Sequence, residues 1–346
     1  MSMPPSGRVT LKDIAERCGY TANTVSRALR NDEKLPQSTR SLIQDLAEKM
    51  GYVPNSSARA LRCGSSHTIA VIINDINNPY YSNMLSQIDQ LLKGKNYHPM
   101  VLCSQLDENL ASEMIRLAIS QRVDGILFFP FNNAQHIHDL HASGIPFVMM
   151  DRWIPDVQAD IARIDDYAAG YTMARHLLSQ GHRRFLYMAG PFINSSQVDR
   201  QNGIIEALQA AGLDLASHLR ILSWDRMPAS PSSDAVFELL KPLDYTAILA
   251  FNDVLAYQAI TALYMSAGIR VPDSISVVGI DHIRWHNTYL PPLSSIAVDG
   301  QSVAETAVEM LFDRIENPGI PFRHRVLPIR LHDDGTTRAP QQGSLE

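Results

Sequence analysis

Two short helical patterns joined at a glycine, close to the amino terminus, constrain the fold of this chain more than any other feature of its sequence. Apolar residues recur at helical spacing on both sides of Gly19, at Leu11, Ile14, Ala15, Val25, Ala28 and Leu29. Glycine reaches positive φ without strain, so Gly19 suits a tight turn, and Thr21 suits the N-cap of the second helix. A third helical pattern over 38–50 predicts a helix that closes a small core. Together these patterns predict a helix-turn-helix unit.

The exposed side of the predicted second helix favours contact with DNA over a plain helical hairpin. It carries small and polar residues and one cation, with no acidic residue before Asp32, and its members are Thr21, Ala22, Asn23, Thr24, Ser26 and Arg27. A helix-turn-helix places its second helix in the major groove with the N-terminal residues leading. Asparagine can pair there with adenine and arginine with guanine. We therefore interpret this segment as a recognition helix.

The charge of the chain is divided unevenly, although the net value is only -6. Residues 1–66 hold 10 Lys and Arg against 6 Asp and Glu, a balance of +4, and the remaining residues hold 20 against 30, a balance of -10. A basic head suits a polyanionic partner, and an acidic body weakens non-specific attraction to DNA. The division predicts a DNA-binding head on a separate sensing body.

Length and composition indicate a globular protein of two or three domains, with 346 residues of which 45% are hydrophobic. The three scattered cysteines form neither a disulfide framework nor a zinc motif, which favours a reducing cytoplasm. No apolar run is long enough to span a membrane, and the amino terminus lacks the core of a signal peptide. We therefore expect a cytoplasmic protein without a membrane partner.

From Thr68 onward, short apolar strand patterns alternate with helical patterns. Strands are predicted at 69–73, 100–103, 125–129, 147–150, 185–189, 247–250 and 276–279, with helices between them, among others at 84–93, 168–180, 204–211, 254–267 and 303–315. Such alternation is typical of parallel sheets covered by helices on both faces. The strands are too many for one compact sheet, so we predict two doubly wound halves that meet near Ile164. The helix over 303–315 would cross back to the first half.

These features resemble the LacI/GalR family of bacterial transcription regulators over nearly the whole chain. The motifs that carry the resemblance are Val9–Ala15, Thr24–Leu29, Gly51–Asn55 and Ala58–Leu61 in the head, and Val123–Ile126, Gly181–Arg183, Asn252–Asp253 and Val278–Asp281 in the body. The resemblance implies a pseudopalindromic operator and a periplasmic-binding-protein-like body that holds its ligand between two subdomains. It also implies a homodimer or tetramer, and the absence of an apolar heptad after Thr336 favours the dimer.

The domains implied by the resemblance divide the chain into three parts. A helix-turn-helix domain would span 1–53, a hinge helix and linker 54–66, and a ligand-binding and dimerisation domain 67–340. Within the last, the N-subdomain would cover about 67–164 and 296–325, and the C-subdomain about 165–295 and 326–340.

The family's DNA-binding positions match residues of the head. Ala22, Asn23 and Arg27 occupy the base-reading positions of the recognition helix. The expected phosphate contacts are Thr10, Thr21 and Thr24.

The polar stretch after the head matches the family's hinge. Asn55 can cap a short helix there, but the stretch is too short to be helical alone, so we expect it to become ordered only on DNA. Leu61 matches the hinge leucine that inserts into the minor groove and kinks the DNA, with a linker residue packed on the body as the alternative. Arg59 and Arg62 would lie near phosphates or in that groove.

Polar and aromatic residues stand where the predicted strands end, which is where open α/β sheets bind ligands. The candidate ligand-binding residues are Asn78, Tyr80, Tyr81, Asp151, Arg152, Arg200, Trp224, Asn252 and Asp281. Aromatic faces with carboxylate, amide and guanidinium groups suit a polyhydroxyl ligand. The resemblance implies the same positions except Tyr80 and Trp224, which we expect to stack on a sugar ring. The structural alternatives are a loop cap for Asp281, a core position for one of the two tyrosines and a salt bridge for Arg152.

Two features leave the kind of ligand open. Many sugar binders of the family carry Gln at the place of Val298, where the nearest polar residues here are Asp299 and Gln301. Arg152 and Arg200 together would favour an anionic sugar, and purine-responsive relatives exist too. We rank a sugar or sugar acid above a purine.

We therefore interpret the chain as a ligand-responsive repressor of carbohydrate-utilisation genes. Ligand would close the cleft and shift the dimer interface near the hinges. The ligand can change the balance between the open and closed states only by the difference in its affinity for them. The alternatives are an enzyme with a DNA-binding head and a sugar-transport module. The body lacks a glycine-rich phosphate loop, a nucleophile elbow and a metal triad, and the head opposes a transport role.

No metal or cofactor is expected from the sequence. Three histidines, His136, His138 and His141, resemble a metal cluster, but only the last two share a helix face. We interpret them as part of a solvated helix.

Overall fold

The computed structural model describes residues 9–53, 64–191, 195–227, 232–283 and 292–341. The chain forms two compact units, residues 1–66 and 67–346, which we call the head and the body. Four residues expected in the hinge, Asn55, Arg59, Leu61 and Arg62, lie outside the described residues.

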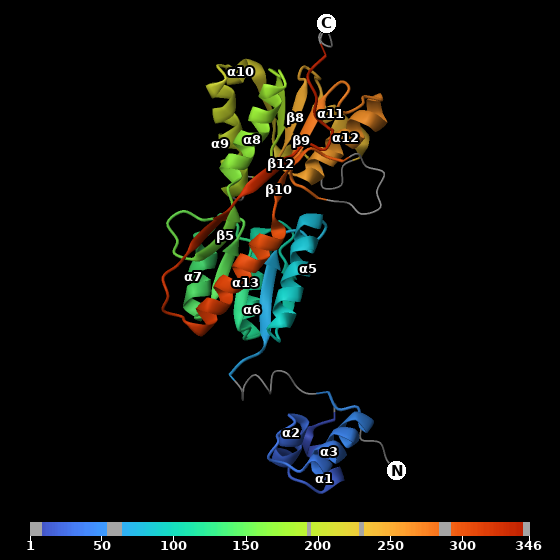
Figure 1. Ribbon diagram of the computed structural model, residues 1–346, viewed down its shortest axis with the longest axis vertical. Helices are drawn as coiled ribbons and strands as arrows, with labels where there is room; N and C mark the ends of the chain where they lie inside the picture. The colour runs from blue at the N-terminus through green and yellow to red at the C-terminus, as the bar shows by residue number, and fades with distance from the viewer. Residues whose placement is uncertain (1–8, 54–63, 192–194, 228–231, 284–291, 342–346) are drawn as a thin grey trace. The chain divides into compact units, whose positions relative to one another are not determined.

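The head is a bundle of three helices, α1 (Leu11–Cys18), α2 (Ala22–Leu29) and α3 (Gln37–Lys49) (Figure 1). Their apolar faces meet in a core where Ile14, Val25 and Ile43 are fully buried. Gly19 ends α1 with a φ of 74°, and the Thr21 side chain caps α2. The predicted helix-turn-helix is confirmed, and so are the local roles of the glycine and the threonine.

The first sheet of the body has six strands in the order β11-β5-β4-β3-β1-β2, and every pair is parallel. Its strands are β1 (Thr68–Ile73), β2 (His98–Cys103), β3 (Gly125–Phe128), β4 (Phe147–Met150), β5 (Asp160–Ile164) and β11 (His324–Leu327). Helices α5 (Pro79–Gly94) and α13 (Gly300–Glu316) cover one face, and α6 (Glu108–Ser120) and α7 (Ala134–Ser143) cover the other. Side chains of β1 alternate between the two faces, as a strand buried on both sides requires.

The second sheet has the order β12-β10-β9-β8-β6-β7, and only its β10–β12 pair is antiparallel. Its strands are β6 (Phe185–Met188), β7 (Leu219–Leu222), β8 (Ala247–Ala250), β9 (Ser276–Asp281), β10 (Ser295–Val298) and β12 (Ile329–His332). Its helices are α8 (Asp166–Ser179), α9 (Ser195–Ala210), α10 (Leu215–His218), α11 (Ser233–Leu240) and α12 (Asp253–Ala267). Figure 1 shows α8 and α9 on one side of the sheet and α11 and α12 on the other. Among the described residues, no helix combines the length and apolarity needed to cross a membrane.

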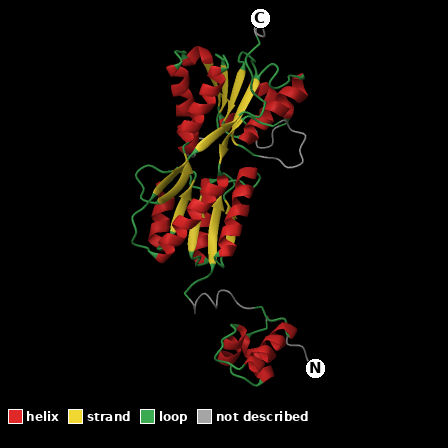
Figure 2. Cartoon of the chain, viewed as in Figure 1, coloured by secondary structure: helices red, strands yellow, loops and turns green. Residues whose placement is uncertain are grey.

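The chain passes between the two sheets after β5, after β10 and after β11 (Figure 2). Helix α13 therefore returns to the first sheet, as expected from the sequence. The second and third crossings follow Val298 and Leu327, a few residues beyond the boundaries expected near 295 and 325. The reason is that β10 and β11 each pair along their whole length with one sheet, so the chain can cross only where a strand ends.

Candidate functional site

The recognition helix α2 presents its first turn at the surface of the head. Ala22 and Asn23 are exposed, and the Thr21 hydroxyl accepts a hydrogen bond from the backbone N–H of Thr24 at 3.1 Å. Thr10 caps α1 in the same way and is also exposed. The caps hold both helix starts, and contacts of these threonines with phosphates stay a prediction.

Arg27, the cation of this helix, is paired with Asp32, a partner that the sequence reading did not identify. Nε of Arg27 lies 2.8 Å from Oδ2 of Asp32, and about a third of each side chain is exposed. The arginine N–H and the backbone N–H of Lys34 hold the pKa of the Asp32 carboxyl below its ordinary value. The pair uses one guanidinium N–H, and four further N–H donors can serve a base. The Asp32 carboxylate therefore orients Arg27 and leaves the other guanidinium N–H groups available to a base.

Replacing Arg27 with alanine should relax base selection at one operator position and weaken specific binding by about 1–3 kcal/mol, the value of a good bidentate contact. The measurement is selection from a library of randomised operators, followed by titration of the selected fragments. Arg30→Ala is the matched control, because Arg30 is exposed and its Nε donates to the carbonyl of Ser26. It should change affinity for all sequences alike. An unaltered preference in the Arg27→Ala protein would remove this arginine from base reading.

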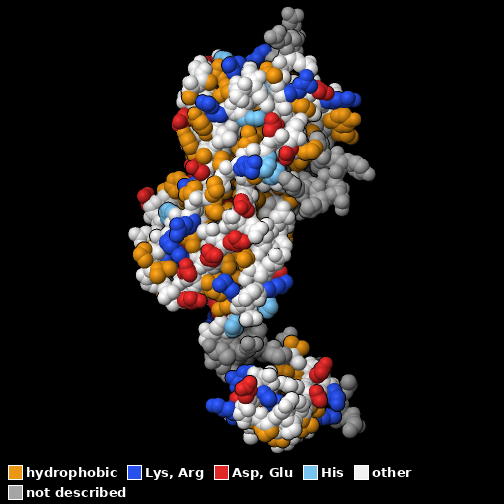
Figure 3. Space-filling view, in the orientation of Figure 1, with side chains coloured by type: hydrophobic (Ala, Val, Ile, Leu, Met, Phe, Trp, Pro, Cys, Tyr) orange, Lys and Arg blue, Asp and Glu red, His pale blue; other side chains and the backbone are white. Residues whose placement is uncertain are grey.

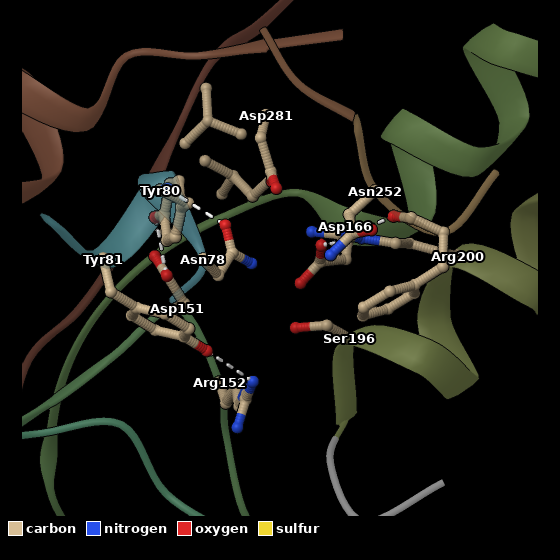
Figure 4. Close-up of a pocket in the computed structure, with 13 residues that line it drawn as sticks. Asn78, Tyr80, Tyr81, Asp151, Arg152, Asp166, Ser196, Arg200, Asn252 and Asp281 are labelled. Atoms are coloured by element: carbon tan, nitrogen blue, oxygen red, sulfur yellow. Dashed lines mark hydrogen bonds and ion pairs between the residues drawn. The ribbon is translucent and has the colours of Figure 1, made fainter. Parts of the chain in front are cut away.

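The body holds a pocket between its two subdomains (Figure 4). Eight of the nine candidate ligand-binding residues line it: Asn78, Tyr80, Tyr81, Asp151, Arg152, Arg200, Asn252 and Asp281. The ninth, Trp224, lies in the 3-10 helix Trp224–Arg226, and its side chain is outside the described part of the chain. The lining residues that the sequence reading missed are Asp166, Ser196, Phe251 and Ile164.

The lining residues meet because strands of both sheets end at the pocket. Asp151 follows β4 and Asp281 ends β9, and carboxyl ends of neighbouring parallel strands lie at one edge of a sheet. The two residues have φ of 62° and 114°, in a region that non-glycine residues rarely adopt. Such strain is often found at ligand sites, and here it turns the chain at the strand ends.

Two asparagines at the pocket are partly used by the fold. The side-chain oxygen of Asn78 accepts from the backbone N–H of Tyr80, and that of Asn252 accepts from Leu255, both at 3.0 Å. These caps begin α5 and α12. The amide NH2 group of each asparagine is then the natural donor to a ligand.

Arg200 is compensated by a carboxylate that sequence reasoning overlooked. Its Nε lies 2.7 Å from Oδ1 of Asp166, and both side chains are almost fully buried. Its Nη1 donates to the carbonyl of Phe251 at 2.6 Å, and the guanidinium lies over that ring at 4.5 Å. A Cβ on Gly170 would lie 2.0 Å from the Arg200 carbonyl oxygen, so glycine is required where α8 passes α9. Helix α9 therefore lines the pocket with two of its residues, Ser196 and Arg200.

The two tyrosines have different environments. Tyr81 is 6% exposed, packs edge-on against Phe129 and belongs to the core of the first subdomain, as expected for one of the pair. Its hydroxyl accepts a hydrogen bond from Nη2 of Arg152 at 2.9 Å. The Tyr80 hydroxyl donates to Oδ2 of Asp151 at 2.6 Å. Within the described residues no carboxylate lies at ion-pair distance from Arg152. The salt bridge considered as an alternative role for this arginine is therefore not present there.

Carboxylates dominate the inner wall of the pocket. Three of them, Asp151, Asp166 and Asp281, face two guanidinium groups (Figure 4). Oδ1 of Asp151 is buried without a hydrogen-bond partner. Enclosure raises the pKa of Asp151 to about 6, against the lowering effect of the Tyr80 hydroxyl, and it raises the pKa of Asp281 well above the ordinary value. A ligand that donates hydrogen bonds would satisfy the free oxygen of Asp151 and would favour the ionised form of these carboxyl groups.

The raised pKa of Asp151 predicts a pH dependence of stability. The unfolded carboxyl loses its proton near pH 3.8 and the folded one near pH 6, so the folded state binds more protons between these values. Its contribution to stability is present below pH 3.8 and is lost as the pH rises through 6. Asp151→Asn should reduce the decline in the free energy of unfolding between pH 4 and pH 6, measured by urea titration. An equally steep decline in the variant would refute this assignment.

Val298 lies on the pocket wall, so the position where the resemblance leads one to expect Gln is apolar. Neither polar neighbour replaces it. Asp299 caps α13 through the backbone N–H of Ser302, and Gln301 donates to Glu305 at 2.8 Å.

Two hydrogen bonds join the subdomains beside the pocket. Nε1 of Trp153, which follows β4, donates to Oδ2 of Asp199 at 2.8 Å, and its backbone N–H donates to the Ser195 hydroxyl at 3.0 Å. Asp199 and Ser195 belong to α9 of the other subdomain. The bonds stabilise the enclosed form of the pocket, and sequence reasoning did not identify them.

Trp153→Phe should weaken ligand binding by up to about tenfold, because it removes one hydrogen bond with a net value of 0.5–1.5 kcal/mol and keeps the ring. Calorimetric titration of the body's ligand measures the effect. Asp199→Ala should give a similar loss, and the double variant should lose no more than either single one. Fully additive losses would contradict a direct interaction of the pair.

Two family descriptions match the chain. Residues 10–55 match the description "Bacterial regulatory proteins, lacI family", and residues 174–337 match "Periplasmic binding protein-like domain". The first match coincides with the helix-turn-helix head and the second with much of the two-sheet body. The chain combines a LacI-family helix-turn-helix domain with a periplasmic-binding-protein-like domain. The resemblance and the fold class predicted from the sequence are confirmed.

Curated relatives of this chain span most of its length. The transcriptional regulator DegA of Bacillus subtilis is 29% identical over 87% of this chain and 89% of its own. The repressor PurR of Photobacterium profundum is 28% identical over 89% and 92%, and the ribose operon repressor of Escherichia coli is 28% identical over 94% and 99%. All three are named regulators or repressors, so the chain is a DNA-binding transcriptional regulator and the enzyme alternative is dropped.

Solved structures of LacI-family proteins have the same fold. The Lac repressor dimer bound to operator and the anti-inducer ONPF superposes with a TM-score of 0.79, at 24% identity over 96% of this chain and all of that one. A LacI-family regulator of Enterococcus faecium with bound ribose has a TM-score of 0.69, at 25% identity over 79% of this chain and all of that one.

Proposed function

We propose that this regulator is a repressor of carbohydrate-utilisation genes whose operator affinity is switched by a small neutral sugar bound between the subdomains. The observation that carries the proposal is the pocket wall, where an unpartnered Asp151 oxygen and the Asp281 carboxyl stand beside two asparagine amides. Sugar hydroxyls both donate and accept, so one ring can satisfy carboxylates and amides together.

The charges of the pocket support a neutral sugar over the sugar acid allowed by the sequence. Arg200 already pairs with Asp166, and Arg152 faces Asp151 and a tyrosine hydroxyl. Three carboxyl groups face two guanidinium groups, so no cation of the pocket is left over to neutralise an anionic ligand. An anionic ligand would therefore be buried without a countercharge, which is unfavourable.

The aromatic part of the pocket lining supports a monosaccharide. The exposed part of Tyr80 and the ring of Phe251 provide apolar surfaces for a sugar ring. Ribose bound to the Enterococcus faecium regulator and the name of the ribose operon repressor support the same ligand class.

A purine is the second candidate, because PurR is as similar to this chain as the ribose operon repressor is. The same aromatic rings could stack on a base, and the carboxylates could accept its N–H groups. A base has fewer donors than a sugar, however, and would leave part of the acidic wall unsatisfied.

The proposed mechanism uses two copies of the chain. In a cytoplasmic homodimer, paired hinges with Leu61 would hold a bent pseudopalindromic operator while the heads read its half-sites. A ligand that binds the enclosed body more tightly than the open one would change the population of the DNA-binding state. The Lac repressor dimer bound to operator supports this arrangement.

A thermal-shift screen of the full-length protein tests the ligand class. Ribose, xylose, glucose, gluconate, galacturonate, hypoxanthine and guanine form the three arms, and a true ligand raises the melting temperature by mass action. We expect a shift with a neutral monosaccharide. A shift confined to sugar acids or to nucleobases would overturn the neutral-sugar proposal.

A further inference from the structure

Three polar side chains outside the ligand pocket have the composition of a transition-metal site. His282 directly follows β9, His332 ends β12, and Asp334 lies just beyond it. Nε2 of His282 is 3.1 Å from Oδ2 of Asp334, and the ligand atoms of all three residues lie within 4.8 Å of one another. We propose that these residues bind a divalent transition-metal ion, for which zinc is the best fit.

One serine holds the backbone of the two histidines. Ser295 of β10 is the register partner of His332, and its hydroxyl accepts from the backbone N–H of His282 at 3.0 Å. The same hydroxyl donates to the buried carboxylate of Asp253 at 2.7 Å. The histidine rings are stacked, with centroids 4.2 Å apart and planes at 16°, so a ring must turn before both in-plane nitrogen lone pairs can meet at one ion. The backbone positions of the two histidines are fixed, and only side-chain torsions need to change.

The spacing of the donors fits a small ion. Zinc binds histidine nitrogen and carboxylate oxygen at about 2.0–2.2 Å, so donors around one tetrahedral ion lie about 3.3 Å apart. The separation of His282 and Asp334 already meets this spacing. His332 needs a side-chain rotation that takes its ring out of the stack, and solvent can occupy the fourth position. Calcium and magnesium prefer oxygen donors, which makes two imidazoles a poor site for them.

The group is accessible to an ion from solution. The side chain of His282 is 15% exposed and that of Asp334 is 37% exposed. Figure 3 shows histidine side chains near acidic and basic ones on the visible face of the body. His282 is the neighbour of Asp281, so a bound ion would hold the strand end that carries a pocket carboxylate. The site is distinct from the pocket, and its test does not depend on the ligand.

Metal titration of the full-length protein tests the site. Tag-free protein stripped with EDTA is titrated with Zn²⁺ by calorimetry and with Co²⁺ by absorption spectroscopy. We expect one ion per chain at this site, d–d bands without thiolate charge transfer, and a rise in melting temperature on adding Zn²⁺.

Variants locate the ion. His332→Gln and Asp334→Asn should each weaken Zn²⁺ binding at least about tenfold, because even residues behind the ligands have effects of that size. His138→Gln removes an exposed histidine of α7 and should leave binding unchanged. If His332→Gln fails to fold, Asp334→Asn still tests the site, because the Asp334 side chain is 37% exposed. Absence of Zn²⁺ binding, or equal affinity in the parent and the Asp334→Asn protein, would overturn the proposal.

Discussion

Replacing Asp166 with asparagine is expected to lower the free energy of unfolding of the body by about 3–5 kcal/mol, the effect of removing one partner of a buried ion pair. The Arg200 guanidinium would keep its charge, and its remaining acceptors, the asparagine oxygen and the carbonyl of Phe251, would be neutral. Urea unfolding of the full chain, followed by circular dichroism, measures the loss. The same change should also weaken ligand binding, because both members of the pair line the pocket.

Two further variants separate this effect from a general cost of removing charge. Asp273→Asn breaks the pair with Arg338, whose side chains are 45% and 54% exposed, and should cost no more than about 1 kcal/mol. The double variant Asp166→Leu, Arg200→Met should be more stable than Asp166→Asn, since it leaves no isolated buried charge. If all three variants lost the same amount, the ion pair would have no special structural role.

Asp281→Ala is expected to abolish the response to ligand while leaving DNA affinity unchanged. A carboxylate that accepts two sugar hydroxyls contributes about 1.5–3 kcal/mol per bond, so the ligand affinity should fall at least about a hundredfold. Calorimetry with the sugar found in the screen measures the fall, and an operator-binding titration with and without that sugar measures the lost response.

The control for this experiment is Asp253, a carboxylate near Asp281 that does not line the pocket. Asp253 accepts hydrogen bonds from the Ser295 hydroxyl and the backbone N–H of Ile283. The main effect of Asp253→Asn should therefore be a lower free energy of unfolding, with little change in the selectivity among sugars. A normal ligand response in the Asp281→Ala protein would exclude Asp281 from the ligand site. The alternative role as a loop cap would then be favoured.

Part of the candidate site was predictable because several of its residues end or closely follow a buried strand. Asp151 and Asn252 each come after a continuous apolar run, and such runs end at the pocket edge of a parallel sheet. Asp166 could not be found in this way. Its role depends on the contact of α8 with α9, which places it beside Arg200 across 34 positions of the sequence.

Some strands escaped prediction because no continuous apolar run marks them. Strand β5 is buried but is interrupted by Asp160 and Arg163. Both β11 and β12 have partly exposed side chains along their length, so neither shows a continuous apolar run. Without β12 in the second sheet, His332 and His282 have no apparent relation in the sequence. The hydrogen bond between Trp153 and Asp199 was also missed, because it forms only where the two subdomains meet.

The central claim is that a basic head binds operator DNA under the control of a ligand in the acidic body. The most direct test is a fluorescence-anisotropy titration of the full-length protein with a selected operator, at several salt concentrations, with and without the sugar found in the screen. We predict that the logarithm of the affinity falls linearly with the logarithm of salt, and that the sugar changes it at least about fivefold. Binding that shows neither salt dependence nor preference for any fragment, or that is identical with and without the sugar, would contradict the account.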